Sequence, residues 1–138
     1  MGGVSGNAGV FARIGDMAAF AVMLANQGAA NGQAFIQPEL FEQAIKNHTL
    51  HCEEGRGLGF AVRGRMPVSC GDIFPEGSYG HTGFTGTSLW VDIETSQYVV
   101  FLTNRVHPSR ENTKLIAFRS VVHNACAREY RRAYGANG

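Results

Sequence analysis

The chain has 138 residues, of which 44% are hydrophobic and 17% are charged, and its net charge is +1. This composition can build one compact core and argues against a disordered chain. The near-neutral charge predicts no strong electrostatic attraction to nucleic acid or to an anionic membrane surface. No apolar run approaches the ~18 residues of a membrane span. The first residues do not resemble a signal peptide, and the sequence leaves the cellular location open.

The N-terminal part predicts a loop followed by two helices. Residues 1–14 are glycine-rich and predict a loop. Residues 16–26 predict a helix because apolar residues recur at helical spacing on one face, namely Met17, Phe20, Ala21 and Leu24. Asp16 suits the start of this helix and Gly28 its end. Pro38 predicts the start of a second helix, residues 38–46, which buries Phe41, Ala44 and Ile45.

The remaining part predicts an antiparallel sheet and a long helix. Residues 57–63 predict a short strand, and residues 64–78, with two prolines and three glycines, an irregular loop. Residues 87–93 and 97–104 predict a hairpin with a tight turn between them. The last element is a helix over residues 110–133, with Ser109 as its N-cap and a buried face of Leu115, Phe118, Val122 and Cys126.

These elements predict an α/β (α+β) fold in which the C-terminal helix packs on an antiparallel sheet. We expect two segments, residues 1–56 with the glycine-rich loop and helices, and residues 57–138 with the sheet and the last helix. The three cysteines are odd in number and not closely spaced, so they do not predict a disulfide framework. We expect buried or free thiols, with one disulfide left as an alternative.

The sequence HTG at residues 81–83 lies next to the predicted hairpin, where glycine is unusual. A strand edge can hold a peptide-like ligand by backbone hydrogen bonds, and Gly83 removes a side chain that would obstruct it. Thr82 offers a hydroxyl for a carboxylate or a carbonyl, and His81 offers a donor or a positive charge. The N–H of Phe84 can face an oxyanion. The alternative interpretation is a plain turn that enters a hairpin.

The sequence GHTGFTGTSLWVD, followed by YVVFLTNRVHP, resembles the C-terminal part of serine β-lactamase-like proteins. This family includes class C β-lactamases, penicillin-binding proteins, D-alanyl-D-alanine peptidases and esterases, whose third motif is Lys-Thr-Gly or His-Thr-Gly. The opening GGVSGNAGVF and the later GLGF are also similar to family segments, with Asn7 where histidine is common. The resemblance implies a partial β-lactamase/transpeptidase-like fold with substrate-binding and oxyanion residues at His81, Thr82, Gly83 and Phe84.

The resemblance leaves two interpretations of Asn104, which follows the last predicted strand. It can lie beside a substrate carboxylate, as in the family, or merely cap the turn before Pro108. The family's nucleophile motif S-x-x-K is absent, because no serine of this sequence has lysine three residues later. The family's Y-x-N motif is also absent.

We therefore expect a C-terminal fragment of a serine hydrolase that is inactive by itself and needs no cofactor. The substrate of the parent enzyme would be a β-lactam, a D-Ala peptide or an ester. The alternative is a non-catalytic module that binds peptides or cell-wall fragments. By resemblance, strand 97–104 lacks a neighbour on its far side, and an unpaired edge predicts a homo-oligomer or a swapped dimer.

A cluster of metal-ligand side chains occurs in the sequence HTLHCEE, which contains His48, His51, Cys52, Glu53 and Glu54. Imidazole and thiolate groups this close could hold zinc. Metal sites usually draw ligands from separated positions, and no second cluster matches, so we favour ordinary loop composition and expect no metal.

Overall fold

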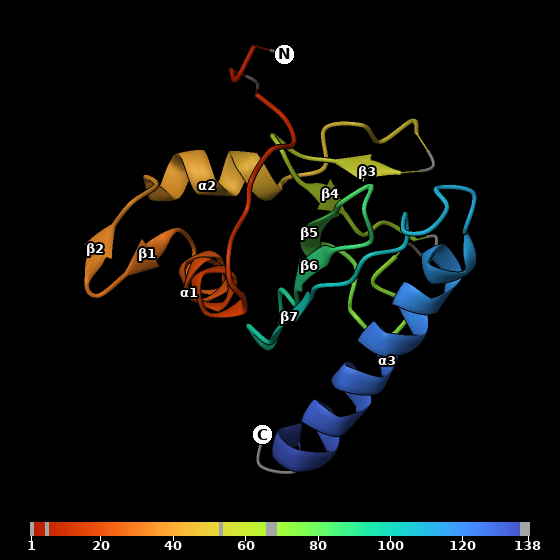
Figure 1. Ribbon diagram of the computed structural model, residues 1–138. Helices are drawn as coiled ribbons and strands as arrows, with labels where there is room; N and C mark the ends of the chain where they lie inside the picture. The colour runs from red at the N-terminus through yellow and green to blue at the C-terminus, as the bar shows by residue number, and fades with distance from the viewer. Residues whose placement is uncertain (1, 5, 53, 66–68, 136–138) are drawn as a thin grey trace.

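The computed structural model describes residues 2–4, 6–52, 54–65 and 69–135. Its elements are α1 (Ile14–Ala25), β1 (Ala29–Ala30), β2 (Gln33–Ala34), α2 (Pro38–Ile45), β3 (Gly55–Arg56), β4 (Ala61–Val62), β5 (Tyr79–Thr82), β6 (Ser88–Val91), β7 (Tyr98–Phe101) and α3 (Lys114–Tyr134). β1 and β2 form a small hairpin, and the other strands form an antiparallel sheet in the order β3-β4-β5-β6-β7. α1 and α3 lie on opposite sides of this sheet (Figure 1). The predicted fold class is confirmed.

The first helix begins and ends as its sequence dictates. The Asp16 carboxylate accepts a hydrogen bond from the Arg13 N–H at 3.2 Å, which satisfies a free donor at the N-terminus. At the other end, the N–H of Gly28 donates to the carbonyl of Met23 at 2.9 Å. Gly28 has φ +87°, and a Cβ there would lie 2.9 Å from the Cβ of Ile36, so only glycine fits this C-terminal turn.

The predicted buried face of α1 is right for Ala21 and Leu24, which are both buried. It is wrong for Phe20, whose side chain is 46% exposed because it lies at the margin of the apolar stripe. In α2, Phe41 is buried and the side chains of Ala44 and Ile45 are half-buried, as predicted.

The predicted strand 57–63 is confirmed at its end and wrong at its start. Its first half is instead the turn between β3 and β4, and only Ala61–Val62 is strand. The Leu58 N–H donates to the carbonyl of Ala44 at 2.8 Å, and the Gly57 N–H donates to the carbonyl of Phe60 at 2.9 Å, so the chain reverses against the end of α2. Gly59 has φ +86°, which suits such a reversal.

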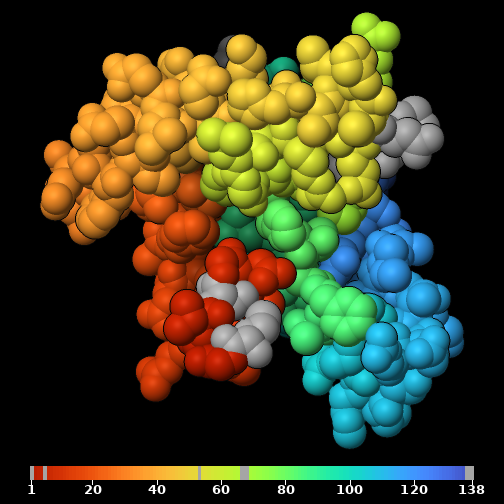
Figure 2. Space-filling view, turned by 90° about the horizontal axis from the view of Figure 1, so that it is seen from above, coloured from red at the N-terminus to blue at the C-terminus, as the bar shows by residue number. Residues whose placement is uncertain are grey.

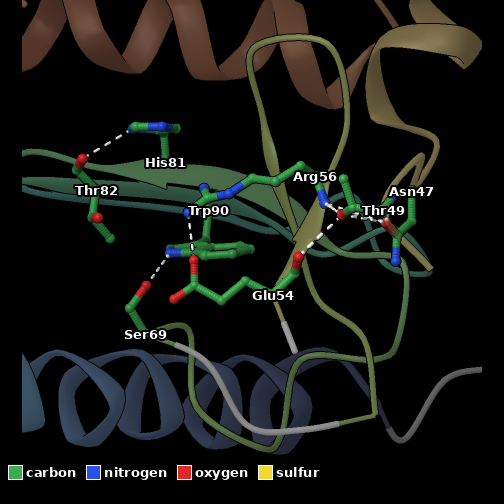
Figure 3. Close-up of polar contacts among 8 residues, drawn as sticks. All are labelled: Asn47, Thr49, Glu54, Arg56, Ser69, His81, Thr82 and Trp90. Carbon is green, nitrogen blue, oxygen red and sulfur yellow. Dashed lines mark hydrogen bonds and ion pairs between the residues drawn. The ribbon is translucent and has the colours of Figure 1, made fainter. Parts of the chain in front are cut away.

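The hairpin predicted over 87–93 and 97–104 is confirmed as β6 and β7, although both strands are shorter than expected. Trp90 of β6 is 1% exposed, and its indole N–H donates to the Ser69 hydroxyl at 3.1 Å (Figure 3). Trp90 packs with Cys70, Phe74 and Ala127 between the sheet and α3.

The long helix is confirmed, but its start and its buried face are not as predicted. α3 begins at Lys114 with Thr113 as N-cap, whereas the Ser109 hydroxyl accepts a hydrogen bond from the Glu111 N–H in the preceding loop. The buried residues are Arg119, His123 and Ala127, and the predicted Phe118 is 51% exposed. The predicted Leu115, Val122 and Cys126 are half-buried. The face is rotated because Arg119 and His123 find hydrogen-bond partners in the sheet.

Tyr79 joins the N-terminal helices to the sheet. Its hydroxyl donates to the carbonyl of Leu24 at 2.8 Å, and its ring meets those of Phe41 and Phe60 edge-on, with centroids 5.8 and 5.6 Å away. These residues belong to the larger apolar core, which also contains Leu89 and other side chains of α1 and β6. Burial raises the pKa of the Tyr79 phenol to about 12.

The three cysteines are free thiols, and burial raises the pKa of Cys70 to about 12. In the part of the chain that the structure describes, no helix is long and apolar enough to cross a bilayer.

Candidate functional site

The HTG residues lie where β5 extends past its neighbour. β6 pairs with all of β5, including His81 and Thr82, whereas β4 pairs only with Tyr79 and Gly80. The N–H of Gly83 donates to the carbonyl of Thr87 at 2.8 Å, on the β6 side. Because hydrogen-bonding groups alternate along an antiparallel strand, the backbone N–H and C=O of Thr82 point to the opposite side, which β4 leaves open.

The side chains of His81 and Thr82 leave β5 on opposite faces of the sheet (Figure 3). His81 is exposed, and its Nδ1 lies 2.9 Å from the carbonyl oxygen of Thr82. Thr82 is half-buried. His81 and Thr82 are thus adjacent at an open strand edge, where the Thr82 carbonyl oxygen is hydrogen-bonded to the His81 imidazole.

The turn from Gly83 to Thr87 directs its carbonyl groups into the protein. All five carbonyl oxygens accept hydrogen bonds. The Gly83 carbonyl accepts from the Gly86 N–H and from Arg119, and the Thr87 carbonyl accepts from the Gly83 N–H and from Arg119. The Phe84 and Thr85 carbonyls accept from Arg105, and the Gly86 carbonyl accepts from the Thr103 hydroxyl. A Cβ on Gly83 would clash with the Thr87 hydroxyl, so any larger residue would force the Thr87 side chain to move. In a trans peptide the N–H points away from the preceding C=O, so the Phe84 N–H points outward.

Two arginines that the sequence analysis missed hold this turn. The Arg105 Nε donates to the carbonyl of Phe84 at 2.8 Å, and its guanidinium lies 4.5 Å from the centroid of the exposed Phe84 ring. Arg119 reaches the turn from α3. Both arginines are buried, at 9% and 6% exposure. The sequence feature that could have revealed Arg119 is a single cationic residue within a helix segment that is otherwise mostly apolar.

Asn104 caps a turn, as one of its two interpretations predicted. Its side-chain oxygen accepts hydrogen bonds from the N–H groups of Val106 at 3.0 Å and His107 at 3.3 Å. Asn104 also lines a shallow hollow of about 320 Å³, together with Arg105, Asn112, Lys114, Leu115 and Phe118. A role beside a substrate carboxylate stays a prediction.

The HTLHCEE segment forms a loop held by other contacts. The Nε2 of His48 lies 2.8 Å from the carbonyl of Gln43, and the Asn47 side-chain oxygen accepts the N–H groups of Thr49 and Arg56 (Figure 3). Glu53 lies outside the described residues. Among the described ones, no three histidine, cysteine or acidic side chains converge on a common point.

The antiparallel sheet with helices on both faces is the fold that the sequence resemblance implied (Figure 1). The model of the β-lactamase family matches residues 1–123. The chain belongs to the β-lactamase family.

Two curated relatives agree with this family assignment. The chain is 37% identical over 112 residues to a protein of Escherichia coli strain K12 named "putative D-alanyl-D-alanine carboxypeptidase", covering 78% of this chain and 25% of the relative. A protein of the same name from Salmonella enteritidis is 37% identical over 121 residues, covering 83% of this chain and 27% of the relative. This β-lactamase-family chain thus spans about a quarter of the length of these relatives.

A solved structure agrees with the fold. The crystal structure of a β-lactamase from Mycobacterium bovis superimposes with a TM-score of 0.63 and 21% sequence identity. The similarity covers 83% of this chain and 44% of the mycobacterial one. The predicted resemblance to serine β-lactamase-like proteins is therefore confirmed, and so is the fold.

Proposed function

We propose that this β-lactamase-family chain supplies the substrate-edge strand of a serine hydrolase whose nucleophile lies outside these residues. The observation that carries the proposal is the open side of β5 at Thr82, followed by an outward Phe84 N–H that has no hydrogen-bond partner in the described part of the chain. The absence of an S-x-x-K sequence among the 138 residues supports the second half of the proposal.

The chemistry follows from the positions of these groups. An extended substrate would pair with the open backbone of Thr82, and the Thr82 hydroxyl would bind its carboxylate. The His81 imidazole, on the opposite face of the sheet, would donate to another group of the substrate or supply positive charge. When the serine attacks the substrate carbonyl, the oxygen gains negative charge, which the Phe84 N–H would stabilise. A base beside the serine would take its proton, and water would later hydrolyse the acyl-enzyme. Without the serine and its base, only positioning and oxyanion effects remain, so this chain should not turn over substrate.

The relatives named "putative D-alanyl-D-alanine carboxypeptidase" make a peptide that ends in D-alanyl-D-alanine the first substrate to test. A β-lactam or a short ester would suit the same edge.

We expect binding without acylation. The intact mass should show no adduct after incubation with benzylpenicillin or with a fluorophosphonate. Titration with N-acetyl-D-alanyl-D-alanine should shift the NMR amide signals of residues 81–84. Thr82→Val should weaken this binding roughly tenfold, because a hydrogen bond to a charged carboxylate is lost. Thr113→Val is the matched control, since the exposed Thr113 side chain makes no capping bond. A stoichiometric adduct would contradict an external nucleophile, and unshifted signals would contradict the substrate edge.

We also propose that a second copy of the chain pairs with the outer edge of β7. Within the described residues β7 pairs only with β6. The Asp92 N–H donates to the carbonyl of Gln97 at 2.8 Å, so by alternation Tyr98, Val100 and Leu102 direct their backbone groups to the open edge. Tyr98 and Leu102 are 36% and 41% exposed. An antiparallel edge can pair with itself about a two-fold axis, which makes a second copy a fitting partner.

Sedimentation velocity tests this pairing. We expect a dimer for the unmodified chain and a monomer for Tyr98→Lys, because edge lysines oppose strand pairing. Tyr134→Lys, which changes a 68% exposed tyrosine near the end of α3, should remain a dimer. Val100→Pro removes an outward N–H without removing a β6–β7 bond, and it should also give a monomer. A monomeric unmodified chain, or a dimer in both edge variants, would refute the proposal.

A further inference from the structure

We infer that Arg119 is a positioning residue, which fixes the Gly83–Phe84 peptide so that the Phe84 N–H faces the substrate side. This inference rests on the proposed function, since it assigns a residue that prepares the same site. Arg119 itself lies on the other side of the turn and would not touch the substrate.

The contacts of Arg119 are concentrated on the two ends of one turn. Its Nη2 donates to the carbonyl of Gly83 at 2.6 Å and to the carbonyl of Thr87 at 3.1 Å. The residue is 6% exposed, and its Nε is buried without a partner in the described part of the chain. The guanidinium therefore joins α3 to the first and last residues of the 83–87 turn.

The electrostatics of this position are unusual for a residue that only packs a helix. None of the ion pairs among the described residues involves Arg119. Burial lowers the pKa of its guanidinium, and so does the neighbouring charge of Arg105. A buried cation without an anionic partner lowers stability, and an apolar side chain of similar size would commonly pack at lower cost. A helix anchor alone therefore does not explain arginine here, whereas a need for strong donors to two carbonyls does.

Peptide geometry links these carbonyl contacts to the substrate side. The C=O of Gly83 and the N–H of Phe84 belong to one planar trans peptide and point in opposite directions. Glycine tolerates many backbone angles, so this peptide could rotate and turn the Phe84 N–H inward. The remaining bond to the Gly83 carbonyl comes from the Gly86 N–H at 3.1 Å, within the same turn, and would rotate with it. The hydrogen bond from Arg119 connects the Gly83–Phe84 peptide to a separate element, α3.

NMR of the full chain can measure the orientation and the mobility of this one N–H. Residual dipolar couplings report the direction of the Phe84 N–H, and the ¹⁵N order parameter reports its mobility. In the unmodified chain we expect an order parameter near 0.85, typical of rigid backbone, and in Arg119→Met a fall below about 0.6 at Phe84. Residues 79–81 and 88–91 should keep their values, because β5 and β6 retain their ladder.

A matched control is available on the same helix. Arg131 also donates to a backbone carbonyl, that of Ile73, at 2.7 Å. Arg131→Met should leave Phe84 unchanged. If Arg119→Met does not fold, Arg119→Lys decides by the same criterion, since its nitrogen is one bond closer to the backbone and is expected to fall short of the two carbonyls.

An unchanged Phe84 in the folded Arg119 variant would overturn the inference. An equal loss of order throughout β5 and β6 would also overturn it, because it would show a general anchor of α3. The titration with N-acetyl-D-alanyl-D-alanine separates this result from the proposed function. If the unmodified chain shows no ligand-induced shift while Phe84 loosens in Arg119→Met, the positioning role stands and the substrate proposal fails.

Discussion

Gly80→Ala is expected to lower the free energy of unfolding by about 3 kcal/mol, as overpacking of a tightly packed site does. Gly80 lies in β5 beside His81, between Ala61 of β4 and Trp90 of β6. A Cβ at this position would clash with the carbonyl oxygen of Leu89 and would lie 2.7 Å from the Trp90 ring. Backbone cannot yield as a flexible side chain does, so β5 and β6 must separate where the HTG residues begin.

Urea unfolding, followed by tryptophan fluorescence, measures this loss of stability. Gly15→Ala is the control, because Gly15 lies in the first turn of α1 and a Cβ there meets nothing within 4 Å. That variant should gain roughly 0.5–1 kcal/mol, since alanine favours a helix over glycine. Equal stability of Gly80→Ala and the unmodified chain would show that β5 and β6 can accommodate the methyl group, and that the close packing is not required.

Acidification should destabilise the fold through His123. Burial lowers the pKa of this histidine to about 4, and the neighbouring Arg119 charge adds to the effect. In the unfolded chain the pKa is near 6.5, so between pH 6.5 and pH 4 the unfolded state binds a proton that the folded state does not. Stability contributed by the neutral His123 is therefore complete above pH 6.5 and is lost as the pH falls toward 4. The expected loss is about 3 kcal/mol.

The surroundings of His123 explain why the folded state resists this proton. Its side chain is fully buried, its Nε2 lies 2.9 Å from the Ser88 hydroxyl oxygen, and its Nδ1 has no partner in the described part of the chain. Urea unfolding at pH 7 and pH 4.5 should show a much smaller pH dependence in His123→Gln. His107→Gln, which changes an exposed histidine, should keep the full dependence. Similar pH dependence in both variants would assign the acid sensitivity to carboxylates instead.

Helix periodicity predicted that α3 exists but not which side it buries. The apolar residues of its first half, Leu115, Ile116, Phe118, Val121 and Val122, surround the helix and define no single stripe. Because apolar residues were expected to be buried, the prediction placed Phe118 on the buried face. The buried face contains Arg119 and His123, because Arg119 Nη2 finds carbonyls of the 83–87 turn and His123 Nε2 finds the Ser88 hydroxyl. Such partners come from residues more than 30 positions away, which a local pattern cannot reveal.

The hairpin beside the HTG motif was easier to predict than the turn at residues 57–60. The apolar runs in residues 87–93 and 97–104 and the tight turn between them located the β6–β7 hairpin correctly, because those patterns are local. In contrast, GLGF was expected to be strand, and the closeness of Gly57 to the Ala44 carbonyl made it a turn. The consecutive residues His81 to Phe84 were predicted to act together from the motif alone. Arg105 and Arg119, which hold the turn, follow from tertiary contacts only.

The contacts of Tyr79 limit how this site could be transplanted or recombined. Its hydroxyl is bonded to the end of α1, and its ring is packed against Phe41 of α2 and against Phe60. A crossover between residues 56 and 57 would exchange the motif strand but divide these contacts between two parents. A graft of the HTG strand into another scaffold would likewise need α1 and α2 with it. In a chimaera, these helices and the motif strand should therefore be inherited together.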